Sequence, residues 1–312
     1  MRKKSNRNFS ILYIMGYGRS GSTVLETIIS KLDSMVASGE LEYFLERGID
    51  KNECCTCGKE IIHCPFWANI SLEYLSTIKI AGLENKSVRN IKRKQERLLT
   101  AWKRLIFGGG DVGQDYCMTE SALIRNIISD DQILLDSSKS PGRALALMLC
   151  GFDVKVIHLF RDSRAVAYSW QRKRVYSEFG KKKNSMPIYP SFLTSIYWIV
   201  YNITASFVIA RYFRNKSIRW EYDSIADTPE RFISDLEKLI GRNAGDLLPM
   251  LQGEKEFSTM KHSVAGNPVR FAKKQTFQAD REWVFSMNKF TKFIVTLITG
   301  SLLILYRWRR EK

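Results

Sequence analysis

Histidine and acidic side chains are scarce in this sequence of 312 residues. Asp and Glu number 32 against 49 Lys and Arg, so the formal net charge is +17. The expected partners are therefore anionic: a nucleotide, an acidic glycan or a membrane surface. No base-stacking or groove-reading motif accompanies the basic residues, which argues against nucleic acid. Of the three histidines, His158 lies inside a predicted strand and is expected to be a core residue rather than a base.

Long apolar runs are also few. Residues 1–7 are basic like the start of a signal peptide, but the apolar run that follows is short and no small-residue cleavage site comes after it, so no signal peptide is expected. Residues 191–210 are uncharged but diluted by polar side chains, and residues 290–306 are too short for a membrane span. We predict that both are buried helices of a cytoplasmic protein, with peripheral membrane contact through the basic tail at 307–310 as the alternative.

The stretch that organises the chain is residues 9–30. Residues 9–15 form an apolar run rich in β-formers, which predicts a strand buried on both faces. Residues 24–30 place apolar side chains at helical spacing. Between them, residues 16–23 contain three glycines, an arginine and three serine or threonine side chains. A glycine-rich turn before a helix N-terminus predicts an anion site, because backbone N–H groups and the helix dipole face the ligand.

This loop lacks the lysine of an ATP-binding P-loop. The spacing of Gly16 and Gly21 fits that motif, but Ser22 stands where the lysine belongs, and the cation of the loop is Arg19. The sequence therefore keeps the geometry of a phosphate cradle without the residue that contacts ATP. The alternative is a glycine-rich turn that binds nothing.

Two later strand ends carry cations and hydroxyl groups as well. The strand predicted at residues 131–136 is followed by serines and Lys139, and the strand at 154–160 by Arg161, with Ser169 in the next helix. Because ligands of parallel sheets bind at the carboxyl ends of the strands, we expect these side chains near the glycine loop. The alternatives are a surface lysine beside capping serines, and an arginine and a serine that have no common ligand.

Together these motifs resemble those of the sulfotransferases that use 3′-phosphoadenosine-5′-phosphosulfate (PAPS). Residues 19–23 read Arg-Ser-Gly-Ser-Thr after the first strand, seven residues separate Arg161 from Ser169 as in that family, and residues 262–271 resemble a His…Gly-Asn-Pro…Arg-Phe loop of bacterial members. The resemblance covers residues 9–271. It implies that the first loop binds the 5′-phosphosulfate and that the later residues bind the 3′-phosphate. The implied donor-binding residues are Gly18, Arg19, Ser20, Gly21, Ser22, Thr23, Arg161, Ser169 and Arg270.

The chain departs from the cytosolic small-molecule branch of that family, which uses a lysine in the first loop and a histidine base. None of the histidines follows a suitable strand, whereas Gly39 and Glu40 match the Gly-Glu pair of the tyrosylprotein and glycan branches. The resemblance implies Glu40 as the base, Lys139 as the group that stabilises the leaving oxygen, and Arg19 as the loop cation. Taken alone, Glu40 is an ordinary exposed acid or an acid in the first turn of a helix. No metal is required, because side chains and amides hold the transferred group.

Four of the six cysteines lie close together, at Cys54, Cys55, Cys57 and Cys64. Three interpretations are open: a zinc site formed by Cys55, Cys57 and Cys64 with the imidazole of His63, one or two disulfides, or free thiols in an aromatic cap. The spacing lacks the repeated Cys-x-x-Cys that is typical of zinc sites. Residues 48–120 are predicted to form a Cys-containing, helical insert that caps a substrate cleft.

The sequence thus predicts an α/β protein with a P-loop-like open parallel sheet flanked by helices, in which residues 1–312 form a single domain. The expected activity moves a sulfuryl group from PAPS to an acceptor hydroxyl on a glycan, a lipid-linked molecule or a small molecule. Two other classes stay open. One is a P-loop nucleotide kinase or NTPase, and the other is a non-catalytic, membrane-associated protein that binds a nucleotide.

Overall fold

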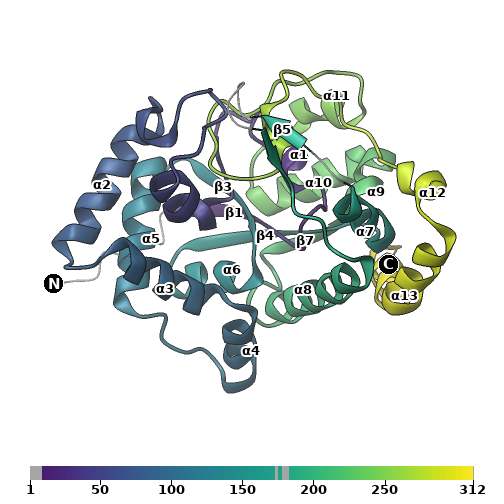
Figure 1. Ribbon diagram of the computed structural model, residues 1–312, viewed down its shortest axis with the longest axis horizontal. Coiled ribbons are helices and arrows are strands. Elements are labelled where there is room, and N and C mark those ends of the chain that lie inside the picture. The colour runs from purple at the N-terminus through teal and green to yellow at the C-terminus, as the bar shows by residue number, and fades with distance from the viewer. Residues whose placement is uncertain (1–8, 173–174, 178–182, 312) are drawn as a thin grey trace.

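The computed structural model describes residues 9–172, 175–177 and 183–311 of the chain, and a five-stranded parallel sheet lies at its centre (Figure 1). The strand order is β2-β3-β1-β4-β7. The predicted open parallel sheet is confirmed. Its strands are β1 (Ser10–Met15), β2 (Met35–Gly39), β3 (Ile133–Lys139), β4 (Asp153–Phe160) and β7 (Ser217–Glu221).

Strand β1 lies at the centre of the fold. Another strand pairs with each of its edges, and a layer of helices covers each face of the sheet. It pairs in parallel with β3 on one side and β4 on the other, and all its residues from Ile11 to Met15 are inaccessible to solvent. Successive side chains of a strand point to opposite faces. Accordingly Ile11 and Tyr13 pack into one core, and Leu12 and Ile14 pack into the other.

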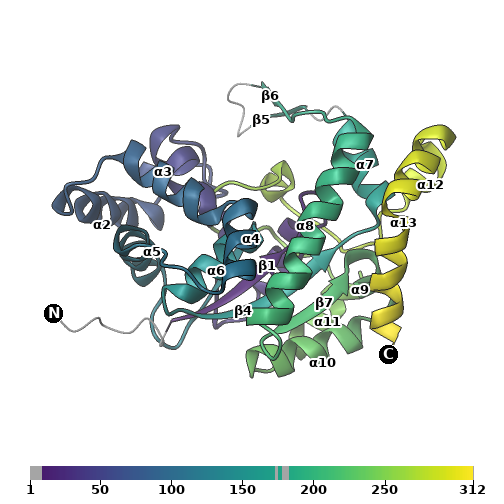
Figure 2. The same ribbon diagram turned by 90° about the horizontal axis from the view of Figure 1, so that it is seen from below.

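Helices cover both faces of the sheet (Figures 1 and 2). The core that contains Ile11 includes side chains of α2 (Trp67–Ile80), α5 (Gln114–Ile127), α6 (Pro141–Leu149) and α8 (Ser191–Tyr212). The core that contains Leu12 includes side chains of α1 (Ser22–Ile29), α9 (Tyr222–Asp227), α10 (Pro229–Ile240) and α11 (Leu248–Leu251). Helices α3 (Asn85–Glu96) and α4 (Leu98–Phe107) add Val88 and Ala101 to the core that contains Ile11. The remaining elements are α7 (Ser163–Gln171), α12 (Glu282–Ser286), α13 (Lys289–Glu311) and a hairpin of β5 (Val175–Ser177) and β6 (Lys183–Ser185).

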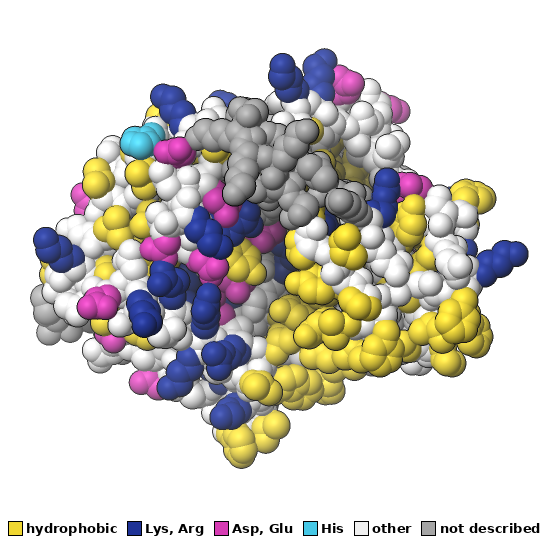
Figure 3. Space-filling view, viewed as in Figure 1, with side chains coloured by type: hydrophobic (Ala, Val, Ile, Leu, Met, Phe, Trp, Pro, Cys, Tyr) yellow, Lys and Arg dark blue, Asp and Glu magenta, His cyan; other side chains and the backbone are white. Residues whose placement is uncertain are grey.

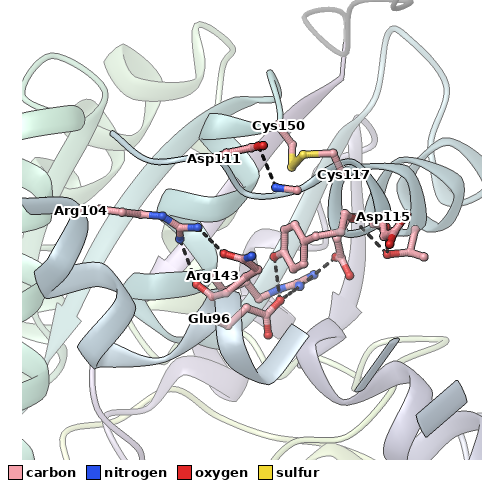
Figure 4. The surroundings of a disulfide bond; sticks show 12 residues. Glu96, Arg104, Asp111, Asp115, Cys117, Arg143 and Cys150 are labelled. Atoms are coloured by element: carbon pink, nitrogen blue, oxygen red, sulfur yellow. Dashed lines mark hydrogen bonds and ion pairs between the residues drawn. A yellow bond between two sulfur atoms is a disulfide. The ribbon is translucent and has the colours of Figure 1, made fainter. Parts of the chain in front are cut away.

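The helices of the predicted insert are joined to the sheet by buried charge. The guanidinium of Arg143 on α6 is fully buried and contacts the carboxylates of Glu96, Glu120 and Asp136 at 2.6 Å, 2.8 Å and 3.1 Å. Figure 4 shows Arg143 beside Glu96. Asp136 lies on β3 and the two glutamates lie on α3 and α5, so one cation connects three elements. Burial and these carboxylates act in opposite directions on the pKa of Arg143, and the carboxylates prevail and raise it.

A disulfide between Cys117 on α5 and Cys150 at the end of α6 lies beside that cluster (Figure 4). The sequence offered no signal for this pair, because the two residues are far apart in the chain and meet only when α5 packs beside α6. No disulfide joins Cys54, Cys55, Cys57 or Cys64 in the structure, so of the three interpretations left open for this cluster the disulfide is not formed.

Both segments at 191–210 and 290–306 are helical as predicted, but neither helix is fully buried, and α8 exposes Phe192 and Phe207 to 59% and 54%. Helix α13 packs Val295, Leu303 and Tyr306 inward but exposes Phe290, Phe293 and Leu297. Figure 3 shows apolar side chains gathered over α8 and beside α13, on the face seen in Figure 1. Both α8 and a stretch of α13 are long and apolar enough to cross a membrane by length and composition, with 39% and 22% of their apolar windows buried.

Candidate active site

A cavity of about 630 Å³ opens at the carboxyl edge of the sheet, where the segments after β1, β2 and β3 meet. Parallel strands end at a common edge, so residues far apart in sequence line one space. Its lining includes Gly16–Thr23 except Ser20, then Glu40, Glu42, Lys139, Trp170, Met186, Tyr197, Tyr201, Gly266, Asn267 and Val269. No described residue of α2, α3, α4 or α5 is part of this lining.

The glycine loop presents the start of α1 to the cavity. Gly21, the residue before the helix, has a φ of 85°, and a Cβ there would lie 2.1 Å from the ring of Tyr222. Only glycine fits, both for the left-handed backbone and for the close approach of the ring. No side chain caps α1, and Ser22 and Thr23 of its first turn line the cavity. The first-turn N–H groups and the helix dipole therefore face the cavity, as an anion site requires.

Arg19 supplies the cation of this loop. Its own φ of 69° is unusual for a residue with a side chain, and backbone of this kind clusters at functional sites. The guanidinium lies 4.7 Å above the ring of Trp170, and Nη2 is 2.9 Å from Sδ of Met186. A cation over an aromatic face is held in place while keeping its charge. Arg19 is thus fixed at the wall of the cavity.

Glu40 and Lys139 meet in the same cavity. Lys139 Nζ donates a hydrogen bond to Glu40 Oε1 at 2.6 Å and another to the carbonyl oxygen of Ser137 at 2.9 Å. Lys139 has a φ of 73°, the second left-handed non-glycine residue of the site. The site therefore joins a carboxylate from the end of β2 and an ammonium from the end of β3.

The backbone that carries Glu40 is held from two directions. Gly39 N–H donates to Oε1 of the buried Glu26 at 2.7 Å, and the Glu40 N–H donates to the carbonyl oxygen of Val264 at 3.2 Å. A Cβ on Gly39, whose φ is 79°, would lie 2.1 Å from that same oxygen. Glycine is therefore required at position 39, because only glycine lets the segment that contains Val264 pass this close.

The carboxyl group of Glu42 also lines the cavity, although the sequence analysis did not single it out. The backbone N–H of Glu42 donates to Ser138 Oγ at 2.9 Å, two residues after Glu40. Burial first, and then the charge of Glu96, raise the pKa of Glu42 to about 8. This carboxyl therefore keeps its proton to a higher pH than an ordinary glutamic acid, and in the protonated form it can donate a hydrogen bond. Glu96 belongs to α3, so its effect on Glu42 could not be read from the local sequence.

Aromatic side chains line the part of the cavity away from the glycine loop. Tyr17 packs against Trp170 and Tyr201 with ring centroids 6.3 Å and 5.4 Å apart. Along α8, Leu193, Tyr197 and Tyr201 all face the cavity. Their spacing of four residues puts them on one helix face, and this signal was present in the sequence.

Four of the predicted donor-binding residues do not line this cavity. The Ser20 hydroxyl donates to the carbonyl oxygen of Tyr17 at 2.8 Å within the loop. Ser169 is buried in α7. The buried guanidinium of Arg270 donates to the carbonyl oxygens of Ser263, Ala265 and Cys54, and so holds the loop beside the cavity.

Arg161, the fourth, contacts acidic partners. Its Nη2 donates to the backbone oxygen of Asp280 at 2.9 Å and lies 3.2 Å from Oδ2 of the same residue, and its Nε lies 3.4 Å from Oδ2 of Asp223. Burial works against the charged form, but Asp223 and Asp280 outweigh it and raise the pKa of Arg161. The structure thus brings together the loop, Glu40 and Lys139, and leaves Arg161 and Ser169 outside.

His158 is a core residue, as the sequence predicted. It is fully buried, 2.9 Å from Oδ1 of Asn202, and accepts a hydrogen bond from Arg219 Nε at 3.0 Å. Burial first, and then the charge of Arg219, lower its pKa to about 3. His158 is therefore a core residue whose ring nitrogens both have hydrogen-bond partners.

His63, the imidazole expected beside the cysteines, is exposed and lies 3.4 Å from Glu60, whereas His262 lies against the thiols.

No protein-family model matches the chain, and no curated protein matches it. Among solved structures, it is similar to the sulfotransferase domain of the olefin synthase from Synechococcus PCC 7002, at 14% identity and a TM-score of 0.51, over 97% of this chain and 98% of that one. It is also similar to the sulfotransferase domain from the curacin biosynthetic pathway, at 13% identity and a TM-score of 0.48, over 94% and 98% of the two chains. The first likeness shows that the chain has the fold of a sulfotransferase domain.

Proposed function

We propose that the chain is a sulfotransferase that takes the sulfuryl group of PAPS and transfers it to a hydroxyl group. The observation that carries this proposal is the meeting of the glycine loop, Glu40 and Lys139 in one cavity. An uncapped helix start, a carboxylate and an ammonium are what the transfer needs: an anion cradle, a base and a positive charge. The fold of a sulfotransferase domain supports the proposal, but the main argument for it is the arrangement of the glycine loop, Glu40 and Lys139.

In the proposed reaction the acceptor oxygen attacks the sulfur in line with the bond to the 5′-phosphate. The new bond joins sulfur to the acceptor oxygen, the bond from sulfur to the bridging oxygen breaks, and the acceptor proton goes to Glu40. The leaving product is 3′-phosphoadenosine-5′-phosphate (PAP). Lys139, Arg19 and the N–H groups at the start of α1 stabilise the charge that develops on its 5′-phosphate. Positioning and charge neutralisation do most of the work, as in phosphoryl transfer.

The 3′-phosphate is assigned to Arg161 and Ser169 on the family spacing. Arg161 follows β4 directly, and β4 is the neighbour of β1, so the two strand ends lie side by side at the carboxyl edge. The carboxylates of Asp223 and Asp280 that contact Arg161 are the groups a 3′-phosphate would displace. Arg270 supports the donor site by fixing the loop that contributes Gly266 and Val269 to the cavity.

For the acceptor, the lining favours a molecule with an apolar or ring-shaped body. Tyr17, Tyr197 and Tyr201 offer ring faces, which pack against sugars, aromatic rings or chains, and their hydroxyls orient a polar end. The exposed apolar side chains of α8 and α13, together with the basic charge, support an acceptor that is lipid-linked and reached from a membrane surface. We infer a peripheral contact rather than a span, because one face of each helix packs into the protein.

A kinase or NTPase is the second candidate, and one observation counts against it. Ser22 starts α1 where an ATP-binding loop has its lysine, and the cation Arg19 approaches from the other end of the loop. A non-catalytic nucleotide-binding protein would share the cradle but would not need the close contact between Glu40 and Lys139.

The test is the binding of PAP, compared with ADP and Mg·ATP, by calorimetry on wild type, Arg161→Ala and Arg164→Ala. Arg164 is the matched control, since it is paired with Asp162 at the same turn and has no part in the proposed site. We expect PAP to bind far better than ADP, and Arg161→Ala to remove that preference while Arg164→Ala keeps it.

The other outcomes overturn the proposal. Equal or tighter binding of Mg·ATP than of PAP would indicate an NTP-binding enzyme. Tight PAP binding without sulfuryl transfer from PAPS to any member of a panel of sugars, phenols and lipid-linked glycans would indicate a binding protein.

A further inference from the structure

Three thiols and an imidazole converge away from the cavity. The Sγ atoms of Cys55, Cys57 and Cys64 and a ring nitrogen of His262 all lie within 4.8 Å of one another. Three of the separations are shorter: 3.6 Å from Cys57 to Cys64, 3.2 Å from Cys64 to Nδ1 of His262, and 3.7 Å from Cys55 to the same nitrogen. His262 comes from a loop about 200 positions further along the chain, so this is a tertiary cluster.

These separations fit the edges of a tetrahedral zinc site. With Zn–S bonds of about 2.3 Å and a Zn–N bond of about 2.0 Å, a regular tetrahedron has S···S edges of about 3.8 Å and S···N edges of about 3.5 Å. The Cys57–Cys64 separation of 3.6 Å and the Cys55–His262 separation of 3.7 Å lie close to these lengths, and the Cys64–His262 separation of 3.2 Å is shorter by a few tenths of an ångström. A disulfide would instead bring two sulfurs to about 2.0 Å, and none of these cysteines is paired.

The local backbone presents the first two thiols from a tight turn. Cys55 N–H donates to the carbonyl oxygen of Lys59 at 2.8 Å, and Gly58 N–H donates to that of Cys55 at 3.0 Å. Gly58 has a φ of 89°, which glycine adopts without strain. The turn closes back on itself, so Cys55 and Cys57 reach the same point from one short segment.

The other two ligands are oriented by their neighbours. The backbone N–H groups of Phe66 and Trp67, at the start of α2, donate to Sγ of Cys64. The imidazole of His262 stacks on the ring of Phe66, with centroids 5.2 Å apart and planes 9° apart. Such outer contacts fix the direction of ligands in metal sites.

We propose that Cys55, Cys57, Cys64 and His262 bind one structural zinc ion. Four protein ligands close the coordination sphere, as in Cys₃His structural sites, and leave no open position for chemistry. The ligand set corrects the sequence-based alternative, which paired the three cysteines with His63. The proposal is independent of the sulfotransferase assignment, because it rests on ligand geometry alone.

The zinc ion would join two segments that hold the active-site backbone. His262 lies two residues before Val264, whose N–H donates to Ser38 and whose carbonyl accepts from Glu40. On the other side, the carbonyl oxygen of Cys54 accepts from Arg270 Nη2 at 3.2 Å. Removing the metal is therefore expected to loosen the loop of residues 262–270 and the position of Glu40, although no ligand touches the cavity.

The first measurement is metal content of the untagged protein by inductively coupled plasma mass spectrometry, in wild type, Cys57→Ser, His262→Ala and the control His63→Ala. Cys57 is the exposed ligand, so its replacement disturbs packing least. We expect one zinc per chain in wild type and His63→Ala. We expect each ligand variant to bind zinc at least about 100-fold more weakly, beyond what loss of an outer-shell partner costs.

Two further measurements use the wild-type protein, so they test the proposal even if a variant fails to fold. Replacement of zinc by Co²⁺ in the wild-type protein should give the absorption bands of a tetrahedral thiolate site, and a thiol reagent should modify Cys55, Cys57 and Cys64 only after a chelator is added. A wild-type protein that takes up no zinc from excess, zinc retention in His262→Ala, or a disulfide between Cys57 and Cys64 in mass spectra would each overturn it. Since none of these uses PAPS, their result is separate from that of the donor-binding test.

Discussion

The Nζ atom of Lys139 lies 2.6 Å from Oε1 of Glu40, although the two residues are 99 positions apart and end different strands. Both side chains are largely buried, with 15% and 14% of their surface exposed. A charge-assisted hydrogen bond of this length orients each partner. The base and the cation of the proposed reaction are thus held together before any substrate arrives.

Replacing Glu40 by Gln should abolish the base and leave the donor site intact. Glutamine keeps the shape and can still accept a hydrogen bond from Lys139, but it cannot take the acceptor proton. We expect kcat to fall by about 10²–10⁴-fold, with the Kd for PAP unchanged by calorimetry. The control is Glu73→Gln on the exposed face of α2, which should match wild type. Full turnover in Glu40→Gln would contradict the assignment and transfer the base role to another group, with Glu42 the first to test.

The frame and the edge of the site could be predicted because they depend on local signals. Apolar runs predict buried strands, and the residues that follow them meet at one edge in any parallel sheet. Lys139 was found in this way, whereas Glu40 was singled out by the resemblance of Gly39 and Glu40 to the Gly-Glu pair of the tyrosylprotein and glycan branches. One detail differs: β3 continues through Lys139, whereas the strand was predicted to end at Asp136.

What could not be predicted depends on how distant segments pack. The raised pKa of Glu42 comes from burial and from Glu96 on α3. The fourth ligand of the thiol cluster is His262, and no pattern around the cysteines points to a residue so far along the chain. The spacing of Tyr197 and Tyr201 was visible in the sequence, but which helix face meets a cavity is decided by the tertiary fold.

Asp280 is expected to compete with the donor for Arg161. Its carboxylate lies 3.2 Å from the guanidinium and is about half exposed, so a phosphate can displace it. Asp280→Asn should therefore tighten PAP binding by a few-fold, as expected from a partly exposed ion pair worth about 0.2–1 kcal/mol. Calorimetry with PAP and with ADP measures the effect.

The comparison of the two nucleotides is the control for this prediction. ADP lacks the 3′-phosphate, so its affinity should not change in Asp280→Asn. Equal tightening for both nucleotides would mean that the substitution acts through overall charge. Weaker PAP binding would mean that Asp280 orients Arg161 for the ligand rather than competing with it.

Glu26 should make the folded state less stable as the pH rises. Burial is the largest influence on this carboxyl and raises its pKa to about 8, although the Ser137 hydroxyl and the Gly39 N–H donate hydrogen bonds to it. Below the ordinary carboxyl pKa both the folded and unfolded states are protonated. Between that value and about pH 8 the folded state holds a proton that the unfolded state has released, so the free energy of unfolding falls with pH.

Glu26→Gln should remove this contribution, because a neutral amide can accept from Gly39 and donate to Ser137 without titrating. The measurement is the melting temperature of both proteins from pH 5 to pH 9. We expect the difference in Tm to shift in favour of the variant as the pH rises towards about 8. A difference that stays constant across this range would show that Glu26 does not titrate as assigned.

The exposed apolar face of α13 should bind membranes that carry negative charge. Phe293 and Leu297 are 62% and 72% exposed, and Lys289 and Lys292 lie at the start of the same helix. Burying each apolar side chain in the interface contributes up to about 1.5–3 kcal/mol. The double variant Phe293→Ser, Leu297→Ser should therefore lower binding to vesicles with anionic lipid by at least about tenfold in a sedimentation assay. The control variant Leu72→Ser on α2, where the side chain is also exposed, should not lower it.

Binding to these vesicles should weaken at high salt, because salt screens the attraction between the lysines and the anionic lipid. If wild type ignores the vesicles at low salt, or if the double variant binds as well as wild type, α13 is not a membrane contact and the acceptor must be sought among soluble molecules.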